Sequence, residues 1–239
     1  MTNSIENNPG FFKKIINKFF SFFGYKIIRN NNFMERYNEF IAEITESEKE
    51  DIEKFERICL ASKLNLWSIL QSLKYIQKNE IIGDIVECGV YNGNTLSFIV
   101  NFLNNNNLER RIWGYDTFED GFLKIHESEF DIDFKSKKKI DLSDDKTQYY
   151  TLAQVTENIR NNNKIDLNSL KLIKGDVIKT LDNVNNLPEK ISFLRMDTDI
   201  YKTTKKQLEV LYPRLTKGGI LHIDDYGLCP GVKKAVDEY

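Results

Sequence analysis

The sequence predicts an α/β fold in which a parallel sheet has helices on both faces. Two observations support this prediction. From residue 84 onward, short apolar segments of strand length are bounded by clusters of Gly, Asn, Asp or Lys. Segments of helical periodicity lie between them, and this alternation indicates parallel strands joined by crossover helices. A chain of 239 residues has room for one such domain with an appendage.

The individual elements follow from the positions of these segments. The apolar segments predict strands at 84–90, 111–118, 171–177, 191–198 and 219–226. The intervening patterns predict helices at 94–104, 150–161 and 203–215. Upstream, Ser47 to Glu50 matches a capping box and predicts a helix start, and a second lead-in helix is expected at 63–78.

Residues 1–46 are expected to form a separate helical appendage, and residues 47–239 the main domain. Between Phe11 and Phe23, aromatic residues recur three or four positions apart, with lysines among them. A helix with such a face can lie in a membrane interface. We favour packing on the domain or on a second copy in a homo-oligomer, because the rest of the chain is typical of a cytoplasmic protein.

Composition excludes several classes of protein. The formal net charge of -2 gives no global field that would attract nucleic acid. Three widely spaced cysteines, Cys59, Cys88 and Cys229, argue against a disulfide scaffold and a zinc site. No apolar run reaches the roughly 18 residues of a membrane-spanning helix, and the N-terminus lacks the order of a signal peptide. We therefore expect a cytoplasmic protein.

The segment 119–149 is too long and too charged for a plain connection. Long segments of this kind are usually lids or binding loops, or else disordered, and we favour a lid over the active site. The lysines at 135–139 are expected to form a solvated face.

The first candidate site is the segment from Glu87 to Thr95, where a strand passes through a glycine turn into a helix. Gly89 and Gly93 allow close approach of a ligand, and the helix that starts at Asn94 presents free N–H groups. An acid two residues before the first glycine is typical of an S-adenosylmethionine site, where it holds the cationic methionine end. A purely structural turn is the alternative.

Two further acids end the next strands. Asp116 lies 23 residues beyond Gly93, close to the spacing at which an acid meets ribose hydroxyls, or else it caps a turn. Asp176 either accepts a hydrogen bond from the adenine amino group or caps the following helix.

The strongest candidate site is a set of four aspartates. Asp197 and Asp199 end one predicted strand, and Asp224 and Asp225 end the next. Ligands bind at the carboxyl ends of parallel strands. Four carboxylates that meet there would repel one another without a cation, and oxygen ligands suit Mg²⁺. Helix caps or contacts to the nucleotide are the alternative for some of them. His222, in the same strand, is interpreted as a buried residue.

These motifs together resemble the macrocin O-methyltransferase family. The E-C-G-V-x-x-G run matches 87–93, D-x-D-x-Y matches 197–201, and L-Y-P-x-L…G-G…D-D-Y matches 211–226. The resemblance covers residue 50 to the end. It implies a Rossmann-like class I methyltransferase sheet that uses S-adenosylmethionine and Mg²⁺. Relative to that family, the chain ends before two C-terminal edge strands.

The resemblance also implies site residues. The metal is assigned to Asp197, Asp199, Asp224 and Asp225. One of Asp197 and Asp199 is expected to be a ligand and the other the base, with Asp199 taken as the catalytic residue. The donor is assigned to Glu87, Gly89, Tyr91, Gly93, Asn94, Thr95, Asp116, Thr117, Asp176, Val177 and Asp197.

The predicted function is Mg²⁺-dependent methylation of a hydroxyl on a sugar, a glycan or a glycosylated natural product. One alternative is a methyltransferase for small catechol-type acceptors. The other is a truncated, non-catalytic protein that binds S-adenosylmethionine.

Overall fold

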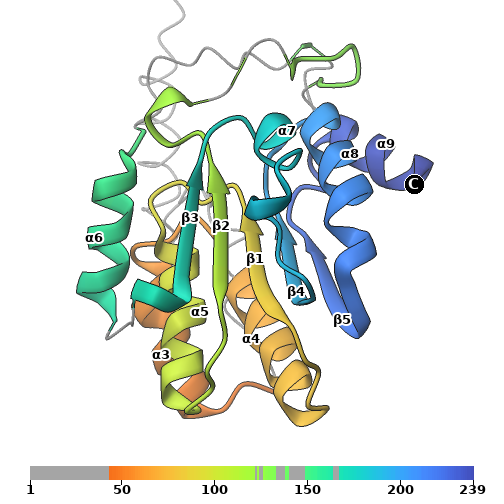
Figure 1. The fold of residues 1–239 in the computed structure, drawn as a ribbon. Helices are drawn as coiled ribbons and strands as arrows, with labels where there is room; N and C mark the ends of the chain where they lie inside the picture. The colour runs from red at the N-terminus through yellow and green to blue at the C-terminus, as the bar shows by residue number, and fades with distance from the viewer. Residues whose placement is uncertain (1–42, 122, 124–125, 133–137, 140–148, 164–166) are drawn as a thin grey trace, which may run out of the picture. The chain divides into compact units, whose positions relative to one another are not determined.

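The computed structural model describes residues 43–121, 123, 126–132, 138–139, 149–163 and 167–239 (Figure 1). The chain divides into two compact units, Met1–Ala42 and Glu43–Tyr239. All described residues belong to the second unit. The predicted N-terminal helix with its aromatic face therefore lies outside the described residues, as does much of the predicted lid at 119–149.

A five-stranded parallel sheet forms the centre of the domain (Figure 1). Its strands lie in the order β3-β2-β1-β4-β5, and every pair of neighbours is parallel. This confirms the predicted fold class. The strands are β1 (Asp84–Cys88), β2 (Ile112–Asp116), β3 (Leu170–Lys174), β4 (Ile191–Met196) and β5 (Leu215–Ile223).

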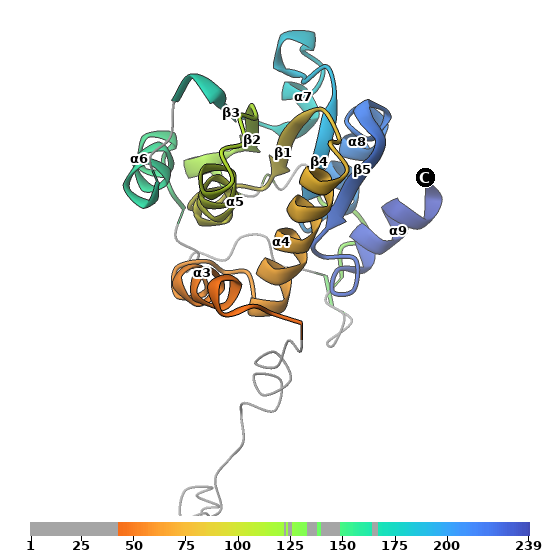
Figure 2. The same ribbon diagram turned by 90° about the horizontal axis from the view of Figure 1, so that it is seen from below.

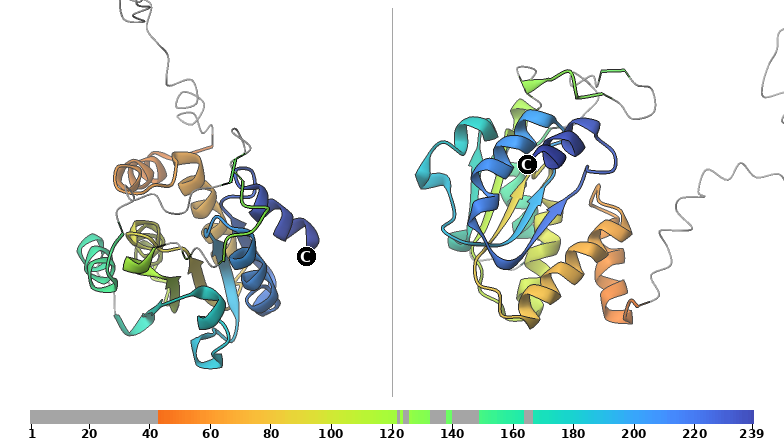
Figure 3. Two further views of the ribbon diagram at one scale, coloured as in Figure 1. Left: turned by 90° about the horizontal axis from the view of Figure 1, so that it is seen from above. Right: turned by 90° about the vertical axis from the view of Figure 1, so that its right-hand side faces the viewer.

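Helices cover both faces of this sheet (Figure 2). One layer contains α3 (Glu46–Glu56), α4 (Lys63–Lys78), α5 (Asn94–Asn105) and α6 (Leu152–Asn162). The other contains α7 (Val177–Thr180), α8 (Tyr201–Val210) and α9 (Pro230–Glu238). Figure 3 shows β5 between α4 on one side and α8 on the other, at the edge of the described sheet.

The two helical layers require strands that are apolar on both faces. In β1, Ile85 belongs to the core cluster under α3 to α6. The next residue, Val86, belongs to the cluster on the α7 and α8 side, together with Leu208 of α8. Successive side chains of a strand point to opposite faces. This explains why the predicted strands are continuous apolar runs and do not alternate with polar residues.

Several predicted boundaries differ from the observed ones. The capping box of α3 consists of Thr45 and Glu48, two residues before the predicted position, because Thr45 has the extended backbone of an N-cap. The predicted helix at 203–215 ends at Val210 and is followed by a 3-10 turn that contains Pro213. Proline lacks the N–H that a continuing α-helix needs, so β5 begins four residues earlier than predicted.

The described part of the segment 119–149 is fastened to α8. The N-cap residue of α8, Ile200, supplies no side-chain hydrogen bond. Instead, the buried carboxylate of Asp131 accepts a hydrogen bond from the Tyr201 backbone N–H at 2.8 Å. The α8 N-terminus is thus capped by a residue 70 positions earlier in the chain. Among the described helices, none is long and apolar enough to cross a membrane.

Candidate active site at the carboxyl ends of the strands

A pocket of about 550 Å³ lies at the carboxyl ends of the strands. Most of the predicted site residues line it. These are Gly89, Tyr91, Thr95, Asp116, Thr117, Asp176, Val177, Asp197, Asp199, Asp224 and Asp225. The predicted residues Glu87, Gly93 and Asn94 are not among its lining residues. The structure therefore brings the predicted donor motif and the predicted metal motif into one cavity.

The glycine turn after β1 is shaped by contacts within the protein. Gly89 has a φ of 87°, and a β-carbon there would lie 1.7 Å from the backbone carbonyl oxygen of Asp197. Gly93 has a φ of 82°, and its β-carbon would meet Val155 and Ile159 of α6. Packing alone accounts for both glycines, and close approach of a ligand is not needed to explain them.

Asp116, at the end of β2, holds this turn in place. Its Oδ2 accepts hydrogen bonds from the backbone N–H groups of Val90 at 2.7 Å and Tyr91 at 2.9 Å. Its Oδ1 accepts one from Phe118 at 2.5 Å. The capping alternative for Asp116 is therefore present in the structure. A carboxylate has about four lone-pair positions, so capacity for a ligand hydroxyl remains.

Asp176, after β3, also caps a helix. Its Oδ1 accepts a hydrogen bond from Ile178 N at 3.0 Å at the start of α7. The same oxygen lies 2.8 Å from Nε2 of His126, and both side chains are buried. Oδ2 has no hydrogen-bond partner among the described residues. His126 belongs to the segment 119–149 and lines the pocket, so this contact joins that segment to the sheet.

Glu87, predicted to hold the methionine end of the donor, lies outside the cavity lining. Its side chain is fully buried, and Oε1 lies 2.8 Å from Nη1 of Arg195. Burial raises the pKa of Glu87 to about 8, although Arg195 opposes the rise. Arg195 is thus the described ion-pair partner of Oε1, whereas Oε2 has no hydrogen-bond partner among the described residues.

The four predicted aspartates gather at the ends of β4 and β5. Carboxylate oxygens of Asp197, Asp224 and Asp225 all lie within 4.8 Å of one another. Asp199 has a φ of 62°, which turns it out of the strand direction, and its carboxylate joins a second group with Asp225 and Cys229. Asp225 is only 6% exposed, and its Oδ2 has no partner among the described residues.

The electrostatics of this group favour a cation. Burial raises the pKa of Asp197, Asp199 and Asp225 above the usual range of aspartate, and neighbouring carboxylates add to the rise. Ionising several carboxylates close together and away from water costs free energy. A divalent ion among them would remove that cost.

His222 lies outside the cavity lining. Its ring packs against Phe193, with centroids 6.0 Å apart, and its Nδ1 has no partner among the described residues. Burial, and then the nearby Arg195, lower the pKa of His222 to about 4. His222, interpreted from the sequence as buried, is partly buried, and its lowered pKa keeps it neutral at pH 7.

Sequence reasoning missed three residues of the site. Arg195 is buried beneath the aspartates and forms ion pairs with three carboxylates. Asn65 of α4 donates a hydrogen bond to Oδ1 of Asp224 from 159 residues away. His126 contacts Asp176 from the segment 119–149. Only Arg195 carried a local signal, because a charged residue inside an apolar strand needs buried partners.

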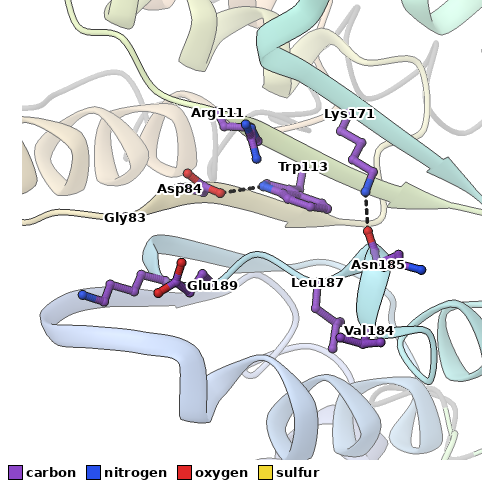
Figure 4. Close-up of a pocket in the computed structure, with 10 residues that line it drawn as sticks. Gly83, Asp84, Arg111, Trp113, Lys171, Val184, Asn185, Leu187 and Glu189 are labelled. Carbon is purple, nitrogen blue, oxygen red and sulfur yellow. Dashed lines mark hydrogen bonds between the residues drawn. The ribbon is translucent and has the colours of Figure 1, made fainter.

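A second pocket lies at the amino-terminal ends of the strands (Figure 4). There, Nε1 of Trp113 donates to Oδ2 of Asp84 at 2.8 Å. Nζ of Lys171 lies 4.3 Å from the centroid of the Trp113 ring. It also donates a hydrogen bond to the Asn185 carbonyl oxygen at 2.5 Å. Figure 4 shows these polar groups paired with one another. This pocket lacks the crowded carboxylates of the first one.

Comparison with known proteins finds O-methyltransferases. The chain is 30% identical to demethyldecarbamoylnovobiocin O-methyltransferase of Streptomyces niveus over 175 residues, which are 73% of this chain and 64% of that protein. It is 30% identical to mycinamicin III 3''-O-methyltransferase of Micromonospora griseorubida over 168 residues, 68% of this chain and 62% of that protein. The chain thus spans less than two thirds of the length of these relatives.

Solved structures show the same fold. The O-methyltransferase NovP superposes with a TM-score of 0.64 at 30% identity, covering 73% of this chain and 69% of NovP. The calicheamicin methyltransferase CalS11 superposes with a TM-score of 0.52 at 22% identity, over 84% of this chain and 86% of CalS11. The family model described as macrocin O-methyltransferase (TylF) matches residues 27–239. The chain belongs to the macrocin O-methyltransferase family.

Proposed function

We propose that this protein transfers a methyl group from S-adenosylmethionine to a hydroxyl of a sugar or glycosylated small molecule, with a divalent cation, Mg²⁺, in the site. The observation that carries the proposal is the shared cavity. It holds the glycine turn after β1 and the aspartates after β4 and β5. A transferase of this kind needs donor and acceptor sites in contact, because the reacting atoms must be aligned.

The donor is assigned to the β1 and β2 side of the cavity. Gly89, Tyr91, Thr95, Asp116 and Thr117 line it there. Asp176 and Val177 line the neighbouring part, where Oδ2 of Asp176 has no hydrogen-bond partner among the described residues and can accept from an amino group, with Lys179 Nζ 3.9 Å away. PaMTH1, which shares the fold at 15% identity, has S-adenosylhomocysteine bound, and this supports the donor assignment.

The cation is assigned to Asp197, Asp224 and Asp225. Their oxygens lie close enough to share one ion, and the buried, unpartnered Oδ2 of Asp225 fits an ionic ligand. An all-carboxylate set suits Mg²⁺, which prefers oxygen and keeps several waters. Bound there, Mg²⁺ would hold hydroxyl oxygens of the acceptor and lower the pKa of one of them.

Asp199 is assigned as the general base. It lines the cavity and is not a member of the three-carboxylate group, and its carboxylate lies instead beside Asp225 and Cys229. The acceptor oxygen forms a bond to the methyl carbon while the carbon–sulfur bond breaks, and the hydroxyl proton passes to Asp199. The products are a methyl ether, S-adenosylhomocysteine and a protonated Asp199, which then returns its proton to water.

The relatives support the acceptor class. Their names describe methylation of novobiocin and mycinamicin precursors, and a third relative, 27% identical, methylates a rhamnosyl group of a tetracenomycin. The rival catechol-type acceptor would use the same residues. The non-catalytic alternative would bind the donor product without turnover.

A panel assay with labelled S-adenosylmethionine separates these alternatives. Purified protein is incubated with glycosides that carry free vicinal hydroxyls and with simple catechols, each with Mg²⁺ or with EDTA. We expect label in the glycosides with Mg²⁺ and none with EDTA. Transfer to catechols alone would move the function to the rival class. Binding of S-adenosylhomocysteine in calorimetry without transfer to any acceptor would favour the non-catalytic alternative.

A further inference from the structure

Arg195, on β4, is a buried cation beneath the proposed cation site. It is 2% exposed, yet it contacts carboxylates from three different strands. Nη1 lies 2.8 Å from Oε1 of Glu87 and 2.6 Å from Oδ2 of Asp197, and Nη2 lies 3.0 Å from Oδ1 of Asp224. One guanidinium therefore joins the ends of β1, β4 and β5.

These contacts divide the oxygens of the two aspartates. In Asp197, Oδ2 is held by Arg195, and in Asp224, Oδ1 is held by Arg195 and Asn65. Each carboxylate then keeps one oxygen that neither Arg195 nor Asn65 contacts. Hydrogen bonds to one oxygen of a carboxylate fix its rotation, and groups behind metal ligands commonly act in this way.

We infer that Arg195 is a positioning residue for the cation site: its planar fork sets the rotation of Asp197 and Asp224 so that each presents a single oxygen to the ion. This inference rests on the proposed function, because it takes these aspartates as ligands. It assigns Glu87 as the counter-ion of Arg195, consistent with the complete burial of Glu87 beside it.

Charge alone does not explain an arginine at this position. A cation next to a divalent ion repels it, so the positive charge of Arg195 by itself would weaken metal binding. A contribution to metal binding must then come from geometry. Arginine presents donors in a rigid plane and can hold two carboxylates at once, whereas lysine offers a compact point charge on a flexible chain.

This difference makes Arg195→Lys the informative variant. It keeps the positive charge that balances Glu87 but loses the fork. The matched control is Arg214→Lys. Arg214 is partly buried and donates to the Pro188 carbonyl oxygen at 3.1 Å, and it does not line the active-site pocket. Mn²⁺ serves as the probe, and its affinity is measured by calorimetry and electron paramagnetic resonance on the full chain. S-adenosylhomocysteine affinity is measured in parallel.

We expect Arg195→Lys to weaken Mn²⁺ binding at least tenfold while S-adenosylhomocysteine affinity changes less than twofold. Arg214→Lys should change neither affinity. Unchanged Mn²⁺ affinity in Arg195→Lys would overturn the inference. Equal loss of both affinities would also overturn it, because that result indicates a general structural role.

A second variant addresses the possibility that a buried lysine disturbs folding. Arg195→Met combined with Glu87→Gln removes the buried cation and its counter-ion together. One positive and one negative charge are lost together, so the net charge beside the ion is unchanged, and weaker Mn²⁺ binding is the result expected if Arg195 orients Asp197 and Asp224. Tighter or unchanged binding would overturn the inference. Failure of the unaltered protein to bind Mn²⁺ while it binds S-adenosylhomocysteine would instead overturn the cation part of the proposed function.

Discussion

The glycine turn after β1 and the aspartates after β4 and β5 lie in one cavity. They differ in how many of their polar atoms have hydrogen-bond partners within the protein. Asp116 accepts three backbone hydrogen bonds, and Gly89 and Gly93 are closely packed against protein atoms. In contrast, Asp225 is buried with an unpartnered oxygen, and the pKa values of the aspartates beside it are raised.

This difference indicates how each half of the site is completed. The glycine turn on the donor side is held by the chain itself, because Asp116 already accepts three backbone hydrogen bonds. The acidic side carries an electrostatic cost that a bound cation would relieve. Changes on the donor side should therefore affect stability and donor binding together. Changes at Asp199 and Asp225, which form no ion pair with Arg195, should affect catalysis and metal binding with little loss of stability.

The largest effect is expected where the two halves touch. In Gly89→Ala, the new methyl group would lie 1.7 Å from the carbonyl oxygen of Asp197, in a backbone with φ of 87°. Backbone atoms cannot move aside easily, so we expect a loss of about 3 kcal/mol or more in the free energy of unfolding and loss of both ligands. Denaturant unfolding measures this change. The control is Gly227→Ala, whose β-carbon would meet nothing within 4 Å.

Removal of a metal ligand should separate activity from stability. We expect Asp225→Ala to lower Mg²⁺-dependent transfer about 10³-fold, because a metal ion contributes several kcal/mol to such a step. S-adenosylhomocysteine affinity should stay within twofold of the unaltered protein, and the melting temperature should not fall. Asp182→Ala, on the surface, is the control. Retained transfer in Asp225→Ala, or in EDTA, would contradict the cation assignment.

Removal of the proposed base should affect turnover alone. Asp199→Asn keeps the shape of the side chain but removes its capacity to take a proton. We expect kcat to fall about 10²-fold or more while Mn²⁺ and S-adenosylhomocysteine affinities remain within threefold. An equal loss of Mn²⁺ affinity would show that Asp199 is a ligand, and would make Asp197 the candidate base.

On the donor side, Asp116→Ala should lower both the affinity for S-adenosylhomocysteine and the stability of the fold. We expect S-adenosylhomocysteine binding to weaken by at least about 1.5 kcal/mol, because charge-assisted hydrogen bonds are lost. The turn at Val90 and Tyr91 also loses two of its hydrogen bonds, so the melting temperature should fall. Mn²⁺ affinity should be unchanged. A drop in melting temperature with unaltered affinity for the donor product would remove the ribose assignment and leave the capping role.

The smallest effect concerns His222 and depends on pH. Its pKa is lowered to about 4 in the folded protein, against about 6.5 in an unfolded chain. Between pH 6.5 and pH 5 the unfolded chain therefore binds a proton that the folded chain does not. Stability should fall over this range by up to about 2 kcal/mol as the pH decreases.

His222→Gln should remove this part of the pH dependence. Denaturant unfolding at pH 7 and pH 5 measures it in both proteins, and turnover at pH 7 should be unchanged. An equal loss of stability in the two proteins would assign the acid sensitivity to other groups. A large loss of turnover would show that His222 acts in catalysis, contrary to its position outside the cavity.

The sequence by itself determined the parts of this protein that depend on neighbouring residues. Apolar runs with helices between them predicted the five parallel strands, because the pattern of burial along a strand or helix is local. It also predicted that Asp197, Asp199, Asp224 and Asp225 would meet, because they follow two neighbouring strands and parallel strands end at one edge.

Only the tertiary structure decided which groups hold these residues in place. Asn65 reaches Asp224 across 159 residues, and His126 reaches Asp176 from the segment 119–149. Glu87 faces Arg195 from a neighbouring strand, which no spacing in the sequence reveals. A residue's type and its place in a motif indicate what chemistry it can perform. Its partners depend on how strands and helices that are distant in sequence pack together, and those partners decide whether it binds a ligand or stabilises the fold.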